Sequence, residues 1–190
     1  KCHKPSQYLI PWLCSKVKMN IFKNAIDSII LGLEDFQSSE SRRLISCTRN
    51  LYAGILLLFK YKLSTLSPFD SDEVLIKQKV YPTLGNNGTL NWRGKGKKTV
   101  AVSQIEERFV SLGIEVDWKR VKSINEHRND IEHNYSRLNK KSIEALISDT
   151  FLIIRDFIYN HLQKDPKDVL GEFAWEMLLK VSEVYKKEKQ

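Results

Sequence analysis

Apolar residues recur at helical spacing along most of this chain, and no other feature constrains its fold as strongly. Between Ile21 and Phe36, for example, they fall three or four positions apart, which places them on one face of a helix. The same periodicity, read with cap and stop signals, predicts six helices at about 20–37, 40–63, 104–112, 117–135, 141–162 and from 166 onward. The expected fold class is therefore all-α, a bundle of about five to six helices.

Three positions predict where particular helices begin. Ser103 is followed by Glu106, the spacing of a capping box, so Ser103 is expected to cap the third helix. Asp117 is expected to cap the fourth helix, and Pro166 to open the last one.

Residues 64–102 interrupt the helical period with proline, glycine and asparagine. We expect an insertion here, with a short helix near 72–80, a small β-hairpin from Leu84 to Trp92 closed at Asn87-Gly88, and a short strand at 99–102. No acidic residue lies between 89 and 105. An aromatic residue among cations can stack a base and hold phosphates, so the predicted RNA-binding set is Trp92, Arg93, Lys95, Lys97 and Lys98. The alternative is a solvated basic hairpin.

The ends of the chain differ from its centre. Residues 1–18 carry four lysines and no acid, and Pro5 and Pro11 are expected to prevent a helix there, whereas Met19 begins a clean amphipathic pattern. We therefore expect 1–18 to be a basic arm or a segment added ahead of the natural start. Residues 19–165 are the expected helical domain, with the insertion 64–102, and 166–190 a C-terminal helix without a stop signal, compatible with further sequence.

The charge, cysteine content and apolar runs of the chain indicate which kinds of partner and compartment to expect. The net charge is +8, with a pI near 9.3, and a basic surface attracts nucleic acid. Cys2, Cys14 and Cys47 are odd in number and widely spaced, which argues against a zinc cage or a disulfide framework and suits a reducing, cytoplasmic compartment. The most apolar run, Leu51 to Phe59, is shorter than the ~20 residues that span a bilayer, so no membrane partner is expected.

One segment carries candidate chemistry, namely Arg128-Asn129-Asp130-Ile131-Glu132-His133-Asn134-Tyr135. It resembles the HEPN superfamily (higher eukaryotes and prokaryotes nucleotide-binding), whose ribonuclease members carry Arg, usually followed by Asn, Asp or His, and then a His that four to six residues separate from the Arg; here four residues separate Arg128 from His133. The Tyr two positions after the His resembles HEPN toxins that are paired with minimal nucleotidyltransferase antitoxins. Arg120 with His127, and Arg155 with His161, share only the bare spacing, and we interpret Arg155 and His161 as structural.

The resemblance implies a HEPN-like helical bundle with the activity of a metal-independent endoribonuclease that needs no cofactor. It also implies a prokaryotic toxin or phage-defence nuclease, in which a homodimer brings two copies of the motif into one site. It assigns the catalytic residues Arg128, Asn129, His133 and Tyr135. The imidazole would take the proton of the RNA 2′-hydroxyl or deliver one to the leaving oxygen, the guanidinium would neutralise the phosphorane, and Asn129 would orient the phosphate or the imidazole. Tyr135 would donate to a phosphate oxygen or be modified by an antitoxin.

Other interpretations of the segment remain open. On one straight helix Arg128 and His133 point about 140° apart, so a shared site needs a distortion or a second subunit. Arg128 and Glu132 have the spacing of an ordinary surface ion pair, and His133 and Tyr135 that of packing residues. The corresponding alternative functions are a non-catalytic HEPN module that binds RNA, nucleotide or a partner protein, and a helical scaffold piece of a larger protein.

Overall fold

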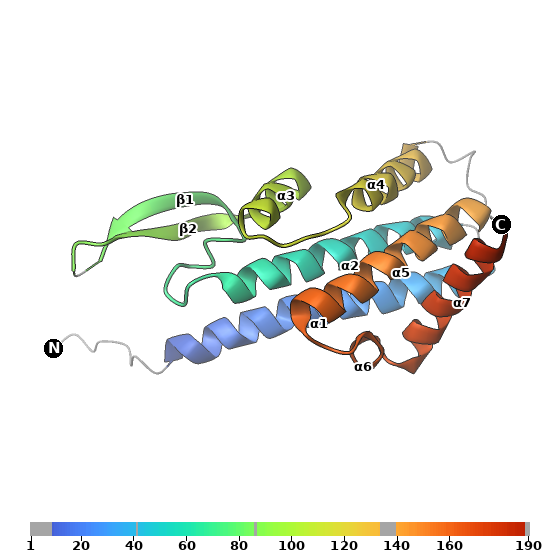
Figure 1. The fold of residues 1–190 in the computed structure, drawn as a ribbon, viewed down its shortest axis with the longest axis horizontal. Helices are drawn as coiled ribbons and strands as arrows, with labels where there is room; N and C mark the ends of the chain where they lie inside the picture. Colours follow the sequence, from blue (N-terminus) through green and yellow to red (C-terminus); the bar gives the residue numbers. More distant parts are fainter. Residues whose placement is uncertain (1–8, 41, 86, 134–139, 189–190) are drawn as a thin grey trace. The chain divides into compact units, whose positions relative to one another are not determined.

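The computed structural model describes residues 9–40, 42–85, 87–133 and 140–188. Along the described chain the elements are α1 (Leu9–Gln37), α2 (Arg43–Leu66), β1 (Lys77–Leu84), β2 (Leu90–Thr99), α3 (Val102–Ser111), α4 (Trp118–His133), α5 (Lys140–Leu162), α6 (Pro166–Leu170) and α7 (Glu172–Glu188) (Figure 1). The chain is thus mostly helical with one small antiparallel hairpin, which confirms the expected helical class and the presence of a hairpin in the insertion.

The chain divides into two compact units, and both α1 and α2 contribute residues to each. The first unit contains the chain up to Lys23 together with Leu58–Leu112, and therefore the hairpin and α3. Its core forms around Phe59 and Phe109, whose ring centroids lie 5.3 Å apart. Buried aliphatic residues complete it: Leu58, Leu63, Ile76, Val100 and Ile105.

The second unit contains Asn24–Leu57 and the chain from Gly113 onward. Here α5 contacts α4, α6 and α7. Buried apolar residues of α5 have helical spacing: Ile143, Leu146, Ile147, Phe151, Ile154, Phe157 and Ile158. Gly54 on α2 lets the helices approach closely, because a Cβ there would lie 2.6 Å from Ile29 Cγ1.

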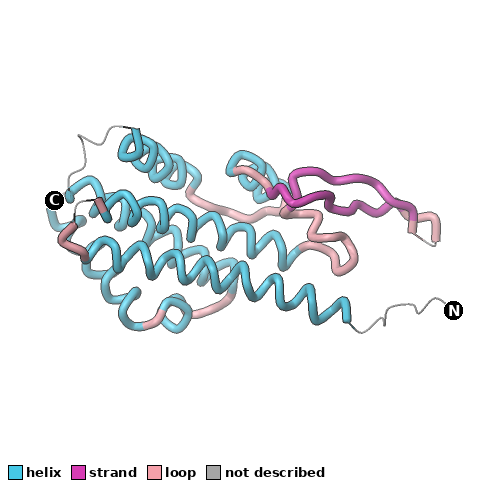
Figure 2. The backbone as a smooth tube through the Cα atoms, turned by 180° about the vertical axis from the view of Figure 1, so that it is seen from behind, coloured by secondary structure: helices cyan, strands magenta, loops and turns pink. Residues whose placement is uncertain are grey.

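The hairpin is longer than predicted and its neighbours differ from the expectation (Figure 2). β1 begins at Lys77, so the helix expected at 72–80 is wrong, and Thr99 ends β2 while Val102 already begins α3, so the strand expected at 99–102 is wrong too. Gly94 explains why residues 71 and 72 are not helical. Its N–H donates to Ser71 O at 2.8 Å, and a Cβ at this position would collide with Asp72 O. The segment before β1 therefore lies along the outer edge of β2 rather than in a helix.

Two expected helix starts are also wrong, whereas a third is confirmed. α1 begins at Leu9, which places Pro11 in the first turn, where an N–H has no acceptor within the helix and proline costs little. Ala101 rather than Ser103 caps α3, because Gln104 Oε1 accepts from Ala101 N at 3.0 Å. Asp117 does cap α4, since its Oδ1 accepts from Arg120 N at 2.9 Å.

The predicted C-terminal helix is two helices. Pro166 opens α6 as expected, but Gly171 with φ 79° breaks the run before α7. None of the helices within the described ranges is long and apolar enough to cross a membrane.

Candidate functional site

The C-terminal half of α4 positions the first two motif residues. Val121, Ile124 and Ile131 form the buried stripe of α4, and the helix contacts α5. Arg128 and Asn129 lie beside this stripe and stay partly exposed. The local sequence therefore folds as an amphipathic helix whose margin presents a guanidinium and an amide to solvent.

Arg128 is held over an aromatic ring. Its Cζ lies 5.5 Å from the centroid of the Tyr52 ring on α2, and its Nη1 donates to Asn129 Oδ1 at 3.4 Å. This distance is within the range of a cation–π contact, which is worth about 0.5–2 kcal/mol. The contact fixes the guanidinium in place without burying it.

Tyr52 is the residue at this site that sequence reasoning missed. Its side chain is only 5% exposed, and among the described residues its Oη has no hydrogen-bond partner. Burial raises the pKa of the Tyr52 phenol, and the nearby charge of Arg128 partly opposes that rise. Nothing in the spacing of the motif points to Tyr52, because the contact depends on how α2 packs against α4.

The other two predicted catalytic residues are not tested by the structure. His133 is the last residue of α4, but its side chain lies outside the described residues, as does that of Glu132. Tyr135 lies wholly outside them. The structure therefore brings Arg128 and Asn129 together and leaves the roles of His133 and Tyr135, and the ion-pair alternative with Glu132, as predictions.

The five residues of the predicted RNA-binding set all lie on β2, but they do not form one surface. Trp92 pairs with Pro82 and Arg93 pairs with Tyr81, so strand alternation turns Trp92 and Arg93 to opposite faces. Arg93 also reaches two carboxylates, Asp70 at 3.8 Å and Asp72 at 3.7 Å. These ion pairs partly neutralise the positive charge of Arg93, which the sequence analysis expected to bind RNA phosphates.

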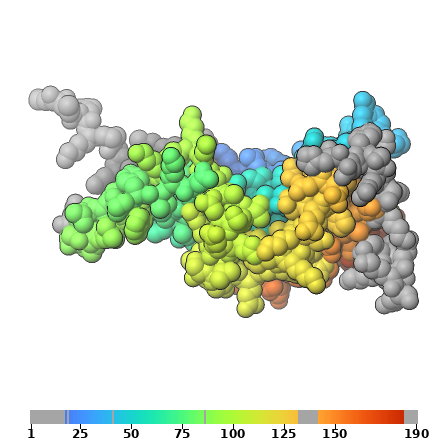
Figure 3. Space-filling model, turned by 90° about the horizontal axis from the view of Figure 1, so that it is seen from above, coloured from blue at the N-terminus to red at the C-terminus, as the bar shows by residue number. Residues whose placement is uncertain are grey.

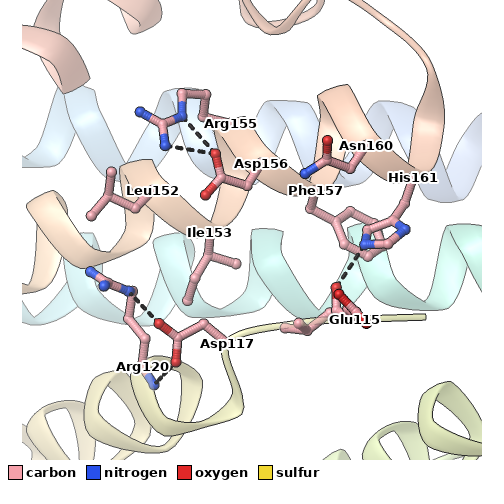
Figure 4. A pocket seen from close by; sticks show the side chains of 11 residues that line it. Glu115, Asp117, Arg120, Leu152, Ile153, Arg155, Asp156, Phe157, Asn160 and His161 are labelled. Carbon is pink, nitrogen blue, oxygen red and sulfur yellow. Dashed lines mark hydrogen bonds and ion pairs between the residues drawn. The ribbon is translucent and has the colours of Figure 1, made fainter. Parts of the chain in front are cut away.

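A separate pocket of about 530 Å³, lined by both charged and apolar side chains, lies in the second unit along α5 (Figure 4). Arg120 bridges Asp117 at 3.1 Å and Asp149 at 2.7 Å. Arg155 pairs with Asp156 at 2.7 Å, and His161 Nε2 lies 2.7 Å from Glu115 O. Because its charged groups already hold one another, this pocket supports the structural interpretation of Arg155 and His161.

Two further observations limit the chemistry of the described residues. Burial raises the pKa of the Cys47 thiol to about 12, with a smaller contribution from Asp35, so Cys47 is protonated and packs in the core. Within the part of the chain that the structure describes, no three His, Cys, Asp or Glu side chains are grouped to hold a metal ion.

Comparisons with known proteins give no relative for this chain. It matches no family model, no curated protein and no solved structure.

Proposed function

We propose that this chain is a metal-independent endoribonuclease of the HEPN type that cleaves RNA through attack of the 2′-hydroxyl. The observation that carries the proposal is the segment Arg128 to Tyr135, in which Arg, Asn, His and Tyr stand in the order and spacing of the HEPN toxin motif. The geometry supports it in one respect. Arg128 and Asn129 are adjacent, partly exposed and on the same helix end as His133.

The reaction needs few groups because RNA supplies its own nucleophile. The 2′-oxygen attacks the phosphorus, its proton passes to a base, and the bond to the 5′-oxygen breaks as that oxygen takes a proton from an acid. The products are a 2′,3′-cyclic phosphate and a free 5′-hydroxyl. In the proposal His133 transfers protons, Asn129 orients the phosphate, and Arg128 stabilises charge on the phosphorane.

The contact with Tyr52 gives Arg128 a defined place in this mechanism. A guanidinium that is already ordered over a ring loses less side-chain entropy when it binds a phosphate than a freely rotating one. Its planar fork suits a phosphate with two oxygens in reach. Tyr52 is therefore a positioning residue in the proposal.

The proposal includes a homodimer and a toxin or phage-defence role. On a straight helix Arg128 and His133 point about 140° apart, and pooling two copies would let the Arg of one meet the His of the other. The pI near 9.3 favours the approach of RNA to such a site. A nucleotidyltransferase antitoxin that modifies Tyr135 belongs to the same proposal and rests on the resemblance alone.

The test is RNA cleavage in EDTA by the full chain. Wild type should cut RNA but not DNA of the same sequence, and the products should end in 2′,3′-cyclic phosphate. Arg128→Ala and His133→Ala should each reduce the rate by about 10²–10⁴-fold, the usual contribution of a positioned acid, base or charge. His127→Ala is the matched control, because His127 lies next to Arg128 but outside the motif. Undiminished cleavage by both motif variants would refute the assignment.

A non-catalytic HEPN module is the alternative that one observation favours. Arg128 contacts Tyr52 and Asn129 within the chain, as a structural arginine would. In that case Arg128→Ala lowers stability, while wild type leaves RNA intact under every condition. Melting curves and cleavage measured on the same preparations separate the two functions.

A further inference from the structure

The hairpin Lys77–Thr99 separates its side chains into two chemically different faces. Antiparallel pairing of Lys79 with Lys95, Tyr81 with Arg93 and Pro82 with Trp92 fixes which residues share a face. We call one the cationic face: Lys79, Tyr81, Thr83, Asn91, Arg93 and Lys95. We call the other the apolar face: Val80, Pro82, Leu84, Leu90 and Trp92. Lys95 Nζ lies 6.0 Å from the Tyr81 ring centroid, as expected for neighbours on one face.

Both faces are open to solvent. On the apolar face Trp92 is 51% exposed, and Leu84 and Leu90 are more exposed still. Figure 3 shows the hairpin, in green, with its side chains at the surface. An uncovered two-stranded ribbon is marginal by itself, and an exposed cluster of large apolar side chains commonly marks a binding surface.

The charge of the hairpin indicates what it binds. Residues 77–99 contain six cations, and no acidic residue occurs from 74 to 105. Arg93 is held by Asp70 and Asp72, but none of the five lysines is ion-paired with a carboxylate in the described ranges: Lys77, Lys79, Lys95, Lys97 and Lys98. Unpaired cations next to exposed aromatic rings are the composition that single-stranded nucleic acid recognises.

We propose that the hairpin Lys77–Thr99 is a binding platform for single-stranded RNA, with bases stacked on Trp92 and Tyr81 and phosphates held by its lysines. Neighbouring strands lie only about 5 Å apart, so a flexible single strand can follow the ribbon from one face to the other. A rigid duplex would contact one face alone. The choice of RNA over DNA rests on the proposed function, whereas binding of a single strand does not.

Insertion into a membrane fits the hairpin less well. Its turn is polar, since Asn87, Gly88 and Thr89 are exposed and Asn87 Oδ1 accepts from the Thr89 hydroxyl at 2.6 Å. Tip-first insertion would bury these groups together with Thr83 and Asn91 of the cationic face, at a cost of several kcal/mol for each unsatisfied group. The hairpin is therefore better suited to a partner that stacks aromatic bases on the apolar face and leaves these polar groups in contact with water or with polar base edges.

The test is binding of a labelled oligouridylate to the full chain carrying His133→Ala, which prevents cleavage during the measurement. Trp92→Ala should weaken binding by about 5- to 150-fold without changing its salt dependence, because stacking involves no ion release. Lys79→Gln combined with Lys95→Gln should lower the slope of log K against log salt by about 1.4, or ~0.7 for each lost phosphate contact. Two matched controls leave the hairpin intact: Tyr159→Ala, an exposed aromatic residue on α5, and Lys164→Gln with Lys180→Gln.

Several results would overturn the proposal. Affinity for the oligouridylate could be the same in the hairpin variants and the controls, or an RNA duplex could bind as tightly as the single strand. Alternatively, Trp92→Ala could abolish binding to phosphatidylserine vesicles, or change the sedimentation coefficient, without affecting RNA. These outcomes would assign the apolar face to a membrane or to a second copy of the chain.

The same measurements separate this proposal from the proposed nuclease. Hairpin-dependent binding without cleavage by the wild type would refute only the nuclease. Cleavage that depends on Arg128 and His133 but is unaffected by Trp92→Ala at limiting RNA would refute only the platform.

Discussion

Replacing Arg108 with alanine is expected to loosen the base of the hairpin. Arg108 lies on α3, and its Nη1 donates to the carbonyls of Val74, at 3.3 Å, and Leu75. Its Nη2 donates to Lys77 O at 2.9 Å. One guanidinium thus fixes the chain just before and at the start of β1. Burial lowers the pKa of Arg108, and the negative charge of Glu107 acts in the opposite direction.

The magnitude follows from these hydrogen bonds. A hydrogen bond from a charged donor contributes about 1.5–3 kcal/mol, but the site is half-buried and water can replace part of what alanine removes. We therefore expect about 1.5–3 kcal/mol for the whole group rather than for each bond. For a chain of 190 residues this corresponds to a fall in Tm of about 3–12 °C, if unfolding is a single transition. The Tm of Arg108→Lys should lie between those of the wild type and Arg108→Ala, because a lysine ammonium cannot donate to several carbonyls with the fixed fork geometry of a guanidinium.

The assay combines thermal unfolding with amide hydrogen exchange. Exchange across Lys77–Leu84 should accelerate in Arg108→Ala, and binding of single-stranded RNA should weaken with it. Val110→Ala is the control, because Val110 lies on the same helix and is 71% exposed. An unchanged Tm together with unchanged exchange in β1 would show that Arg108 does not hold the hairpin.

Variants at three further positions test the remaining contacts. Asp117→Ala should lower the free energy of unfolding, measured in urea, by about 0.5–2 kcal/mol. The backbone hydrogen bond from Arg120 lowers the pKa of Asp117. The loss of stability in the variant should therefore be complete above pH 3.8, the usual pKa of this carboxyl, and should vanish as the pH falls through its lowered pKa. Gly54→Ala should lose about 1–3 kcal/mol by collision with Ile29, and a gain in Tm, as helix propensity alone predicts, would contradict the close approach. Tyr52→Phe should keep RNA cleavage and Tyr52→Leu should lower kcat/KM, and equal rates would exclude a positioning role.

Periodicity located the long helices because each buries one stripe of apolar residues, as α5 does from Ile143 to Ile158. The ends were less predictable. Ser103 is the better cap by composition, yet the extended residue that precedes α3 is Ala101, two residues earlier, and the Gln104 side chain accepts from its N–H. Several local solutions differ by a few tenths of a kcal/mol to about 1 kcal/mol, and packing against the rest of the chain selects among them.

The candidate site was predictable only as far as it is local. The motif identified Arg128 and Asn129 on one helix, where the structure has them, because both belong to the same turn of α4. Tyr52 comes from α2, and its contact with Arg128 exists only once the two helices pack. A sequence pattern carries no information about such a partner without the packing itself.

The hairpin shows why neighbours in sequence need not share a function. Trp92, Arg93 and Lys95 were grouped because they are close along the chain and cationic or aromatic, and the glycines of this region were interpreted as turn signals. In the structure Gly94 lies within β2, at a position where the chain at Asp72 leaves no room for a Cβ. Once the strand is continuous, alternation separates Trp92 from Arg93 and brings Lys95 beside Lys79 and Tyr81 of β1. The alternating Lys79-x-Tyr81-x-Thr83 was the signal for this surface, and it could be recognised only if the chain from Lys77 onward had been predicted as a strand.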